Sequence, residues 1–383
     1  MNKLYAFYCR AYQAVFRAAL PILPYREPIQ LDGLSSIVPL LAEKRIASVL
    51  LVTDASVRSL GLTSGLEAAL KAAGVACAVY DKTVPNPTIA NIEEGRALYL
   101  TAHAQAIIAV GGGSVMDCAK VIGARVVKPR QSVQRMRGLL RVLKRTPLLI
   151  AVPTTAGTGS ETTLAAVITD PAARHKYPIN DFALIPDYAV LDPELTRGLP
   201  PMLTATTGMD ALTHAIEAYI GRSTNRLTRA MSEEAATRIV RSLYKAYTDG
   251  GDMQARADML RAAYCAGVSF TRSYVGYVHG VAHSLEVNTA CRTGWPMRSS
   301  CRIFSTHTAR PAIKSWAGLR VSRASRLQTL PTRKPPKPSS AGFAKQTPKW
   351  AFPKPFRRSA PSIFRKWRIM PPRRATRSTP FPC

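Results

Sequence analysis

The sequence of 383 residues contains no CxxC spacing, and its seven cysteines are scattered. An odd, unpatterned set does not favour a disulfide framework or a thiolate zinc site, and it is typical of a reducing compartment, so we expect a cytoplasmic protein. No apolar run reaches the roughly 18 residues that predict a transmembrane helix. The aromatic N-terminal stretch lacks a clear small-residue cleavage site, and we do not predict a signal peptide.

Acidic residues are missing from the last quarter of the chain. Residues 291–383 contain 22 Lys and Arg and 14 of the 29 prolines, whereas all 23 acids lie in residues 1–290. The net charge of +30 therefore describes this segment more than the rest, and it does not make the whole chain a nucleic-acid-binding protein. Ordinary globular domains do not have such a composition. We expect 291–383 to be a basic, Pro-rich, disordered tail.

The remaining chain has short apolar, β-branched segments that alternate with helical patterns, and from about 205 to 267 only helical patterns occur. This order predicts an α/β domain with a parallel sheet at 29–199 and an all-helical domain at 200–290, truncated by the tail. Residues 1–28 form an amphipathic N-terminal segment, for which peripheral membrane contact and packing on the domain both remain open. The predicted strands are 46–54, 76–80, 104–110 and 148–152.

A strand leads into three glycines and a helix at Gly111-Gly112-Gly113-Ser114. Glycines let a backbone approach a pyrophosphate closely, and a helix N-terminus offers unpaired N–H groups. The motif is neither GxGxxG nor a Walker loop, and a tight turn is the alternative. Asp54 ends the first predicted strand, where it could bind a ribose or cap the next helix. The hydroxyl-rich run 153–163 could supply donors to a ligand or form a surface loop.

Two pairs of polar residues stand four positions apart: Asp210 with His214, and His279 with His283. On helices such pairs lie on one face, so the four groups could converge on one divalent metal. A carboxylate with imidazoles suits Fe(II) or Zn(II). Either pair alone is more often a solvated face or a hydrogen-bonded core histidine. Two pairs downstream of a nucleotide-binding pattern favour the metal site.

Residues 125–145 hold eight Lys and Arg and no acid. The pattern predicts a solvated loop and helix, with contact to an acidic surface as the alternative.

Five motifs together resemble the iron-containing (group III) alcohol dehydrogenases: GGGSVMDCAK, PTTAGTGSETT, DPELT, GMDALTHAIEAY and HGVAHSL. They occur in the family's order within about residues 30–285. The resemblance implies a dinucleotide-binding domain and a helical metal-binding domain with the site between them. It also implies NAD, a divalent metal (Fe(II) first, Zn(II) second), a small alcohol or aldehyde substrate and a homo-oligomer. Nucleic acid is not an expected partner.

The resemblance assigns roles residue by residue. It implies that Asp210, His214 and His279 are metal ligands, and that His283 lies near the nicotinamide and relays protons. An acid at Asp54 favours NAD over NADP. The positions that it expects to line the cofactor are Asp54, Asn86, Gly111, Gly112, Gly113, Ser114, Asp117, Thr154, Thr155, Thr163 and Lys176.

One family feature is absent: the fourth metal ligand, a histidine in a PHG motif about ten residues after HGxxH. Thr293 stands at that place, and the next histidine is His307. Codons can be chosen for this region that read PHGMANAVILPYF in a neighbouring frame, so we hypothesise a shifted reading frame from about Glu286. A genuine basic tail that binds nucleic acid or an acidic partner is the competing interpretation.

Without the fourth ligand, metal binding should be weak and the oxidation of an alcohol to an aldehyde or ketone, or the reverse, impaired. The alternatives are a glycerol dehydrogenase-like enzyme of the same fold and an inactive nucleotide-binding remnant.

Overall fold

The computed structural model describes residues 11, 23–173, 175–221, 223–276 and 278–279, and all of these belong to one compact unit. His283, Thr293, the tail 291–383 and most of the N-terminal segment 1–28 lie outside the described residues.

Six strands form an all-parallel sheet in the order β1-β9-β6-β4-β2-β3. The predicted parallel sheet is confirmed, and the four strands expected from sequence are β2, β3, β4 and β6, each within a few residues of its expected ends. The six strands are β1 (Ile29–Leu31), β2 (Ser48–Val52), β3 (Ala76–Tyr80), β4 (Ala106–Gly111), β6 (Leu148–Pro153) and β9 (Tyr188–Val190).

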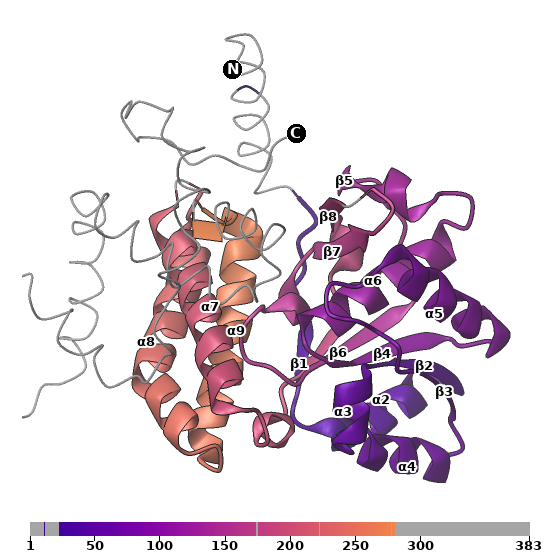
Figure 1. Ribbon diagram of the computed structural model, residues 1–383, viewed down its shortest axis with the longest axis horizontal. Helices are drawn as coiled ribbons and strands as arrows, with labels where there is room; N and C mark the ends of the chain where they lie inside the picture. Colours follow the sequence, from indigo (N-terminus) through magenta and orange to yellow (C-terminus); the bar gives the residue numbers. More distant parts are fainter. Residues whose placement is uncertain (1–10, 12–22, 174, 222, 277, 280–383) are drawn as a thin grey trace, which may run out of the picture. The chain divides into compact units, whose positions relative to one another are not determined.

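Alternate residues of each strand point to opposite sides of the sheet, and both sets are hydrophobic, so both faces are apolar. In β2, Leu50 and Val52 join one core cluster, and Val49 and Leu51 join the other. Figure 1 shows α5 and α6 on the first face and α2, α3 and α4 on the second. The helices are α2 (Ile37–Glu43), α3 (Ala55–Ser59), α4 (Ser64–Ala72), α5 (Ile89–Thr101) and α6 (Gly113–Val127), and the short 3₁₀ turns are η2 (Leu34–Ser36), η3 (Val133–Met136), η4 (Ser160–Thr162), η5 (Phe182–Leu184) and η6 (Pro193–Thr196).

A second, three-stranded sheet has the order β5-β8-β7 and was not predicted. It consists of β5 (Gly138–Leu139), β7 (Ala165–Asp170) and β8 (His175–Asn180). β7 and β8 pair antiparallel over six residues each, and β5 joins β8 in parallel.

The prediction of a solvated loop and helix for 125–145 is wrong in part. Val133 and Met136, at the two ends of η3, and Val142 are buried in the core. Arg125 is also buried, and its Nε donates to Oε1 of Glu93 at 2.6 Å. A buried arginine needs such a partner, and sequence spacing alone does not reveal it.

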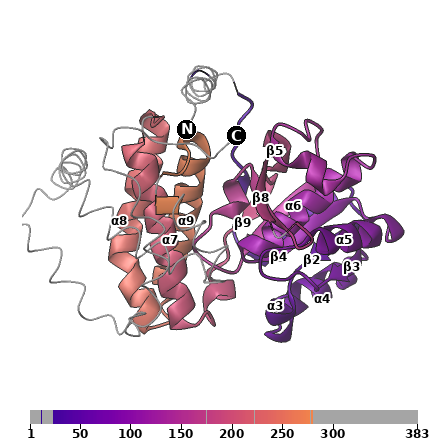
Figure 2. The ribbon, with the colours of Figure 1, turned by 45° about the horizontal axis from the view of Figure 1, so that its top comes forward.

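Three long helices form the second part of the chain: α7 (Pro201–Ile220), α8 (Arg226–Thr248) and α9 (Met253–Ser273). They lie side by side, as Figure 2 shows, which confirms the predicted all-helical region. Their close approach depends on small residues: a Cβ at Gly208 of α7 would lie 2.4 Å from a methyl of Leu243.

Helix α9 packs against the hydroxyl-rich run 153–163 through the backbone of Gly267. A Cβ at Gly267 of α9 would lie 2.2 Å from the Thr162 hydroxyl and 2.8 Å from the Gly159 carbonyl oxygen. Gly159 has φ +61, a conformation that favours glycine. The N-terminal segment adds a further link, since the Tyr25 hydroxyl donates to the Thr162 carbonyl at 3.1 Å.

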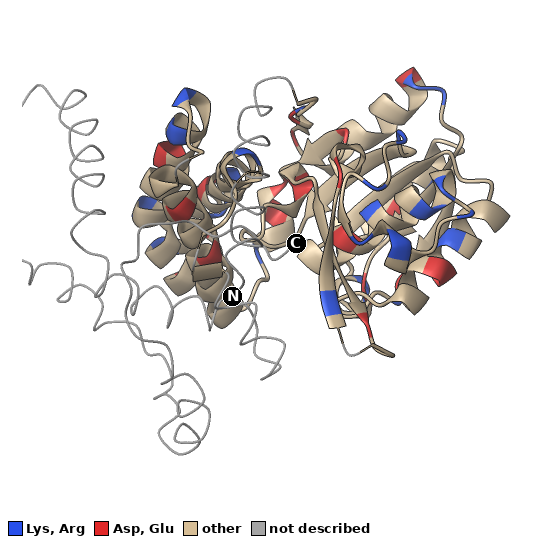
Figure 3. Cartoon of the chain, turned by 90° about the horizontal axis from the view of Figure 1, so that it is seen from above, with Lys and Arg blue, Asp and Glu red and all other residues tan. Residues whose placement is uncertain are grey.

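Charges of both signs are spread over the α/β and helical regions (Figure 3). Among the described helices, none is long and apolar enough to cross a membrane.

Candidate metal centre and cofactor cradle

Helix α7 carries three ionisable side chains on one buried face. Asp210, His214 and Glu217 stand at positions i, i+4 and i+7, so they project from the same side. All three are buried. The helix itself is favoured by Pro201 at its first turn and by five alanines and leucines between Ala205 and Ala218 that fit a helix interior. The sequence therefore builds a rigid helix and places polar groups on its buried side.

His279 comes from the segment after α9 and meets this face. One donor atom each from Asp210, His214 and His279 lie within 4.8 Å of one another, an arrangement that could hold a metal ion. The Nε2 atom of His279 is 3.6 Å from Oδ1 of Asp210. A buried set of one carboxylate and two imidazoles fits Fe(II) or Zn(II) by the chemistry of its donors.

Ring stacking holds the imidazole of His214 in place. Its ring centroid lies 4.1 Å from that of Phe270 of α9 and 4.2 Å from that of His279, with interplanar angles of 14° and 21°. The three rings form a short stack. The stack restricts rotation of both histidines, so their ring nitrogens need little reorganisation to bind a cation.

Glu217 orients His279, a role that the sequence reasoning missed. Its Oε2 lies 2.5 Å from Nδ1 of His279 and accepts from the Gly276 amide at 2.8 Å. Its Oε1 accepts from the Val278 amide at 2.6 Å. A carboxylate on the far nitrogen of a metal-binding histidine fixes its tautomer and raises its basicity. Its place on the α7 face was the available signal.

The two carboxylates control the charge of His279. Burial alone would lower the pKa of this imidazole, but its hydrogen bonds with Asp210 and Glu217 and their charges raise the pKa to about 9. Burial would likewise raise the pKa of Glu217, but the hydrogen bond and charge of His279 and the two amides hold it below its usual value. His279 therefore carries a proton at neutral pH, which a metal ion would have to displace from Nε2 on binding.

The glycine motif forms a turn into α6 that leaves the helix N-terminus open. Gly112 is the N-cap residue and offers no side-chain hydrogen bond to the first turn. A Cβ at Gly111 would lie 2.5 Å from Val115, and one at Gly113 would lie 2.9 Å from Thr158. The uncapped amides and the positive end of the helix dipole fit a pyrophosphate.

Several predicted cofactor positions gather beside this turn. The Lys176 Nζ donates to Oδ1 of Asn86 at 2.7 Å, and the Asn86 amide donates to the Ser114 hydroxyl at 3.2 Å. The Thr154 amide donates to the Gly111 carbonyl at 3.0 Å, which places Thr154 at the ends of β4 and β6. Thr155 follows it, and its hydroxyl would be 3.4 Å from a Cβ on Gly112.

Three other predicted cofactor positions make contacts within the protein. Asp54 caps α3, accepting from the Val57 amide at 2.9 Å, which is the alternative that the sequence left open. Asp117 accepts from the Ser160 hydroxyl at 2.8 Å and from the Val167 amide at 2.9 Å. The Thr163 hydroxyl accepts from Lys120 at 2.9 Å. These contacts give each residue a structural role. Cofactor contact at these positions stays a prediction.

The buried Lys120 holds the hydroxyl-rich run to α6. Its Nζ donates to the carbonyl oxygens of Ser160 at 2.7 Å, Thr163 at 3.0 Å and Ala165 at 2.9 Å. Burial lowers the pKa of Lys120 to about 8 and raises that of the neighbouring Glu161 to about 7. Sequence reasoning passed over both residues, because buried charges cannot be recognised without their partners.

The same architecture recurs in known proteins. Residues 29–193 match the family described as iron-containing alcohol dehydrogenase, and residues 204–292 match the C-terminal domain of the same family. Alcohol dehydrogenase 4 of Saccharomyces cerevisiae is 38% identical over 264 residues, which cover 68% of this chain and 69% of the yeast protein.

Solved structures are similar as well, and two of them serve as examples. A crystal structure of 1,3-propanediol oxidoreductase aligns with a TM-score of 0.69 and 35% identity, covering 71% of this chain and 72% of that one. Sulfoacetaldehyde reductase from Bifidobacterium kashiwanohense, in complex with NAD+, aligns with a TM-score of 0.66 and 28% identity, covering 75% and 76%.

Proposed function

Because the chain belongs to the iron-containing alcohol dehydrogenase family, whose members interconvert alcohols and aldehydes, we propose that it is built for the NAD- and metal-dependent oxidation of a small alcohol, or the reverse reaction. The observation that carries the proposal is the cluster of Asp210, His214 and His279, with donor atoms within 4.8 Å of one another.

These three residues would hold the metal, which when bound polarises the C–O bond of the substrate and lowers the pKa of the alcohol. The protein's own part is positioning. Glu217 presents Nε2 of His279 to the site by holding Nδ1. Phe270 and the His279 ring restrict His214 from either side. His283, outside the described residues, is proposed to carry the proton away.

The turn at Gly111–Ser114 would bind the pyrophosphate of NAD through the amides of α6. Lys176, held by Asn86, adds a positive charge beside this turn. Asp54, two residues after the end of β2, is proposed to favour NAD over NADP, since a carboxylate repels a 2′-phosphate. Sulfoacetaldehyde reductase, which has the same fold, was solved with NAD+, and this supports the choice of cofactor.

We further propose that the activity of this chain is impaired. The family match ends at residue 292, one position before Thr293, where the resemblance places a fourth ligand. A shifted reading frame from about Glu286 would account for the loss. Sequencing the gene tests this idea directly. An intact coding sequence with no closely related longer reading frame would contradict it.

The experiment measures metal content and NADH formation for the chain as written and for a version with the proposed frame restored. The restored version should hold about one metal ion per chain and oxidise short alcohols. The 383-residue chain should bind the metal weakly and form NADH slowly or not at all. A D210N substitution in the restored version should abolish both. Tight metal and normal turnover in the chain as written would refute the impairment.

Two alternatives remain distinguishable by the same assays. A glycerol dehydrogenase-like enzyme would prefer glycerol over short monohydric alcohols. An inactive nucleotide-binding remnant would bind NADH but would form no product even with the frame restored.

A further inference from the structure

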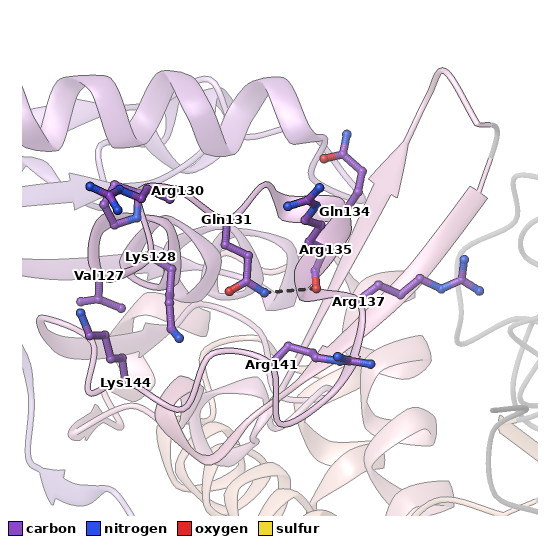
Figure 4. Close-up of a pocket in the computed structure, with 10 residues that line it drawn as sticks. Val127, Lys128, Arg130, Gln131, Gln134, Arg135, Arg137, Arg141 and Lys144 are labelled. Atoms are coloured by element: carbon purple, nitrogen blue, oxygen red, sulfur yellow. Dashed lines mark hydrogen bonds between the residues drawn. The ribbon is translucent and has the colours of Figure 1, made fainter.

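The basic segment 125–145, which the proposed function does not use, lines a shallow surface cavity of about 940 Å³ that is open to solvent. Six of the ten residues that line it are cations: Lys128, Arg130, Arg135, Arg137, Arg141 and Lys144. None of the ten is acidic or aromatic. Figure 4 shows the side chains arrayed around the hollow, with Gln131 near its middle. Like charges gathered in a concave surface raise its positive potential and attract anions.

The chain itself offers little to neutralise this charge. Along the segment, the ion pairs of the described residues involve Arg125 and Arg145, not the six cations of the cavity. Glu286 is the one acidic residue of the whole sequence that lies outside the described part. An anion from outside the chain is therefore the more available partner.

The first half of the segment is held in shape by Arg125. Its Nη1 donates to the carbonyl oxygens of Lys128 at 2.7 Å and Gln131 at 2.5 Å. Val133 and Met136, a few residues on, are fully buried in the core. The backbone that carries the cations between these residues is therefore fixed. Less conformational entropy of the segment is lost when an anion binds.

The second half is held by Asp181. Its Oδ2 accepts from the Val142 amide at 2.8 Å and the Leu143 amide at 3.0 Å. Leu140 and Leu143 have φ of 52° and 50°, left-handed conformations that are uncommon for leucine. Such strained positions persist where surrounding structure holds them, and they occur disproportionately at functional sites.

Exposed apolar side chains accompany these charges. Leu143 is 71% exposed and Leu139 is 40% exposed, and both belong to the same segment. Both leucines alternate in the sequence with lining cations of the cavity. Cations interspersed with exposed leucines are the combination that binds an anionic lipid surface, because the charges meet the headgroups while the apolar chains enter the interface. A single-stranded nucleic acid would instead favour aromatic stacking platforms, and Tyr177, beneath Arg137, is buried.

This surface is separate from the cofactor cradle. Helix α6 begins at the glycine turn and ends at Val127 on the cavity, and its 15 residues span roughly 20 Å. The bound cofactor would therefore leave the cavity open.

The geometry points to a peripheral site for an anionic membrane, in which the cavity takes phosphorylated lipid headgroups and Leu139 and Leu143 enter the interface. The site does not depend on the proposed dehydrogenase activity.

The test must distinguish vesicle binding at the cavity from vesicle binding at the basic tail 291–383, which also attracts anions. The full chain is treated with an acetylating reagent in the presence of phosphatidylcholine vesicles with or without phosphatidylserine, and each lysine is quantified by mass spectrometry. Lys128 and Lys144 should be protected by the anionic vesicles only. Lys71 on α4, exposed and distant in the fold, serves as the internal control. Equal modification of Lys128 and Lys144 with both vesicles would overturn the proposal.

Two variants sharpen the result. R130Q/R135Q/R141Q should raise the lipid concentration for half-protection at least about tenfold, since each cation near an anionic surface contributes several-fold in affinity. R365Q/K366Q/R368Q removes the same charge from the tail and should leave protection of Lys128 and Lys144 unchanged. A tail variant that abolishes this protection as completely would contradict a site in the cavity.

The leucines distinguish a membrane from other anions. L139S/L143S keeps every cation and should weaken protection by vesicles while leaving protection by tripolyphosphate intact. If this variant bound vesicles like the parent, or if an RNA oligonucleotide protected Lys128 and Lys144 where vesicles did not, the membrane proposal would be wrong. Circular dichroism of each variant excludes misfolding as the cause.

Discussion

The Nδ1 atom of His279 lies 2.5 Å from Oε2 of Glu217, which stands on the same face of α7 as Asp210 and His214. The helix that supplies two of the proposed ligands thus also supplies the group that orients the third. Glu217 accepts from the Gly276 amide as well, so it positions both the side chain and the backbone that carries it.

The E217Q substitution should weaken metal binding and leave the free energy of unfolding of the metal-free protein nearly unchanged. E217Q keeps the size of the side chain but loses its charge, and changes of this kind lower metal affinity by about 10- to 100-fold. Competition with a chelator measures the affinity in the frame-restored protein. E194Q alters a carboxylate that is 61% exposed and serves as the control. Unchanged affinity in E217Q would remove Glu217 from the site.

E217A should also destabilise the protein. It leaves the buried amide of Val278 and the partly buried amide of Gly276 without their acceptor, and a buried unsatisfied amide costs about 1–3 kcal/mol. Urea unfolding of the metal-free protein measures this loss. If E217A and E217Q were equally stable, the backbone role of Glu217 would be disproved.

The close contact between α9 and the hydroxyl-rich run predicts a large effect at Gly267. G267A would place a Cβ 2.2 Å from the Thr162 hydroxyl and 3.0 Å from the Gly159 Cα, so helix and loop must separate. We expect a loss of unfolding free energy of about 1–3 kcal/mol, the usual cost of overpacking. Gly65 in α4 has no atom within 4 Å of its added Cβ, so G65A should be neutral or slightly stabilising. Thermal unfolding of both variants gives the comparison.

A substitution in the glycine turn should weaken cofactor binding without changing metal binding. G111A would bring a Cβ to 2.5 Å from Val115 in the first turn of α6 and displace the amides proposed to hold the pyrophosphate. A strain of about 1.4 kcal/mol corresponds to tenfold weaker NADH binding, which fluorescence titration detects. Metal content should stay unchanged. G198A, where the added Cβ meets nothing within 4 Å, should bind NADH normally.

Much of the fold and of the candidate site could be predicted from the sequence because it depends on local patterns. The strand segments, the Gly111 turn and the spacing of Asp210 and His214 are local, and each led to the element that the structure shows. Glu217 and Lys120 were missed, because their partners are backbone groups some 40 to 60 residues away. Asp54 shows a different limit: a carboxylate at a strand end can cap a helix or bind a ribose, and its sequence neighbours do not decide between them.

Glu161 predicts how stability depends on pH. Burial raises its pKa from the ordinary value of 4.5 to about 7, against the weaker opposing effects of its own backbone amide and of Lys120. Between these two pH values the folded chain holds a proton that the unfolded chain has lost. Stability from this group is therefore present below about pH 4.5 and declines as the pH rises to about 7, by roughly 3 kcal/mol at most.

The E161Q substitution would mimic the protonated acid at every pH, so the difference in unfolding free energy between E161Q and the parent should grow in favour of E161Q across that window. Above about pH 8 the sign for Lys120 is opposite, because its lowered pKa makes the folded chain lose a proton first. Urea unfolding from pH 5 to 8 with a chelator present isolates the effect from metal binding, and E194Q provides an exposed control. A constant difference between E161Q and the parent over this range would show that Glu161 is ionised throughout, held so by Lys120.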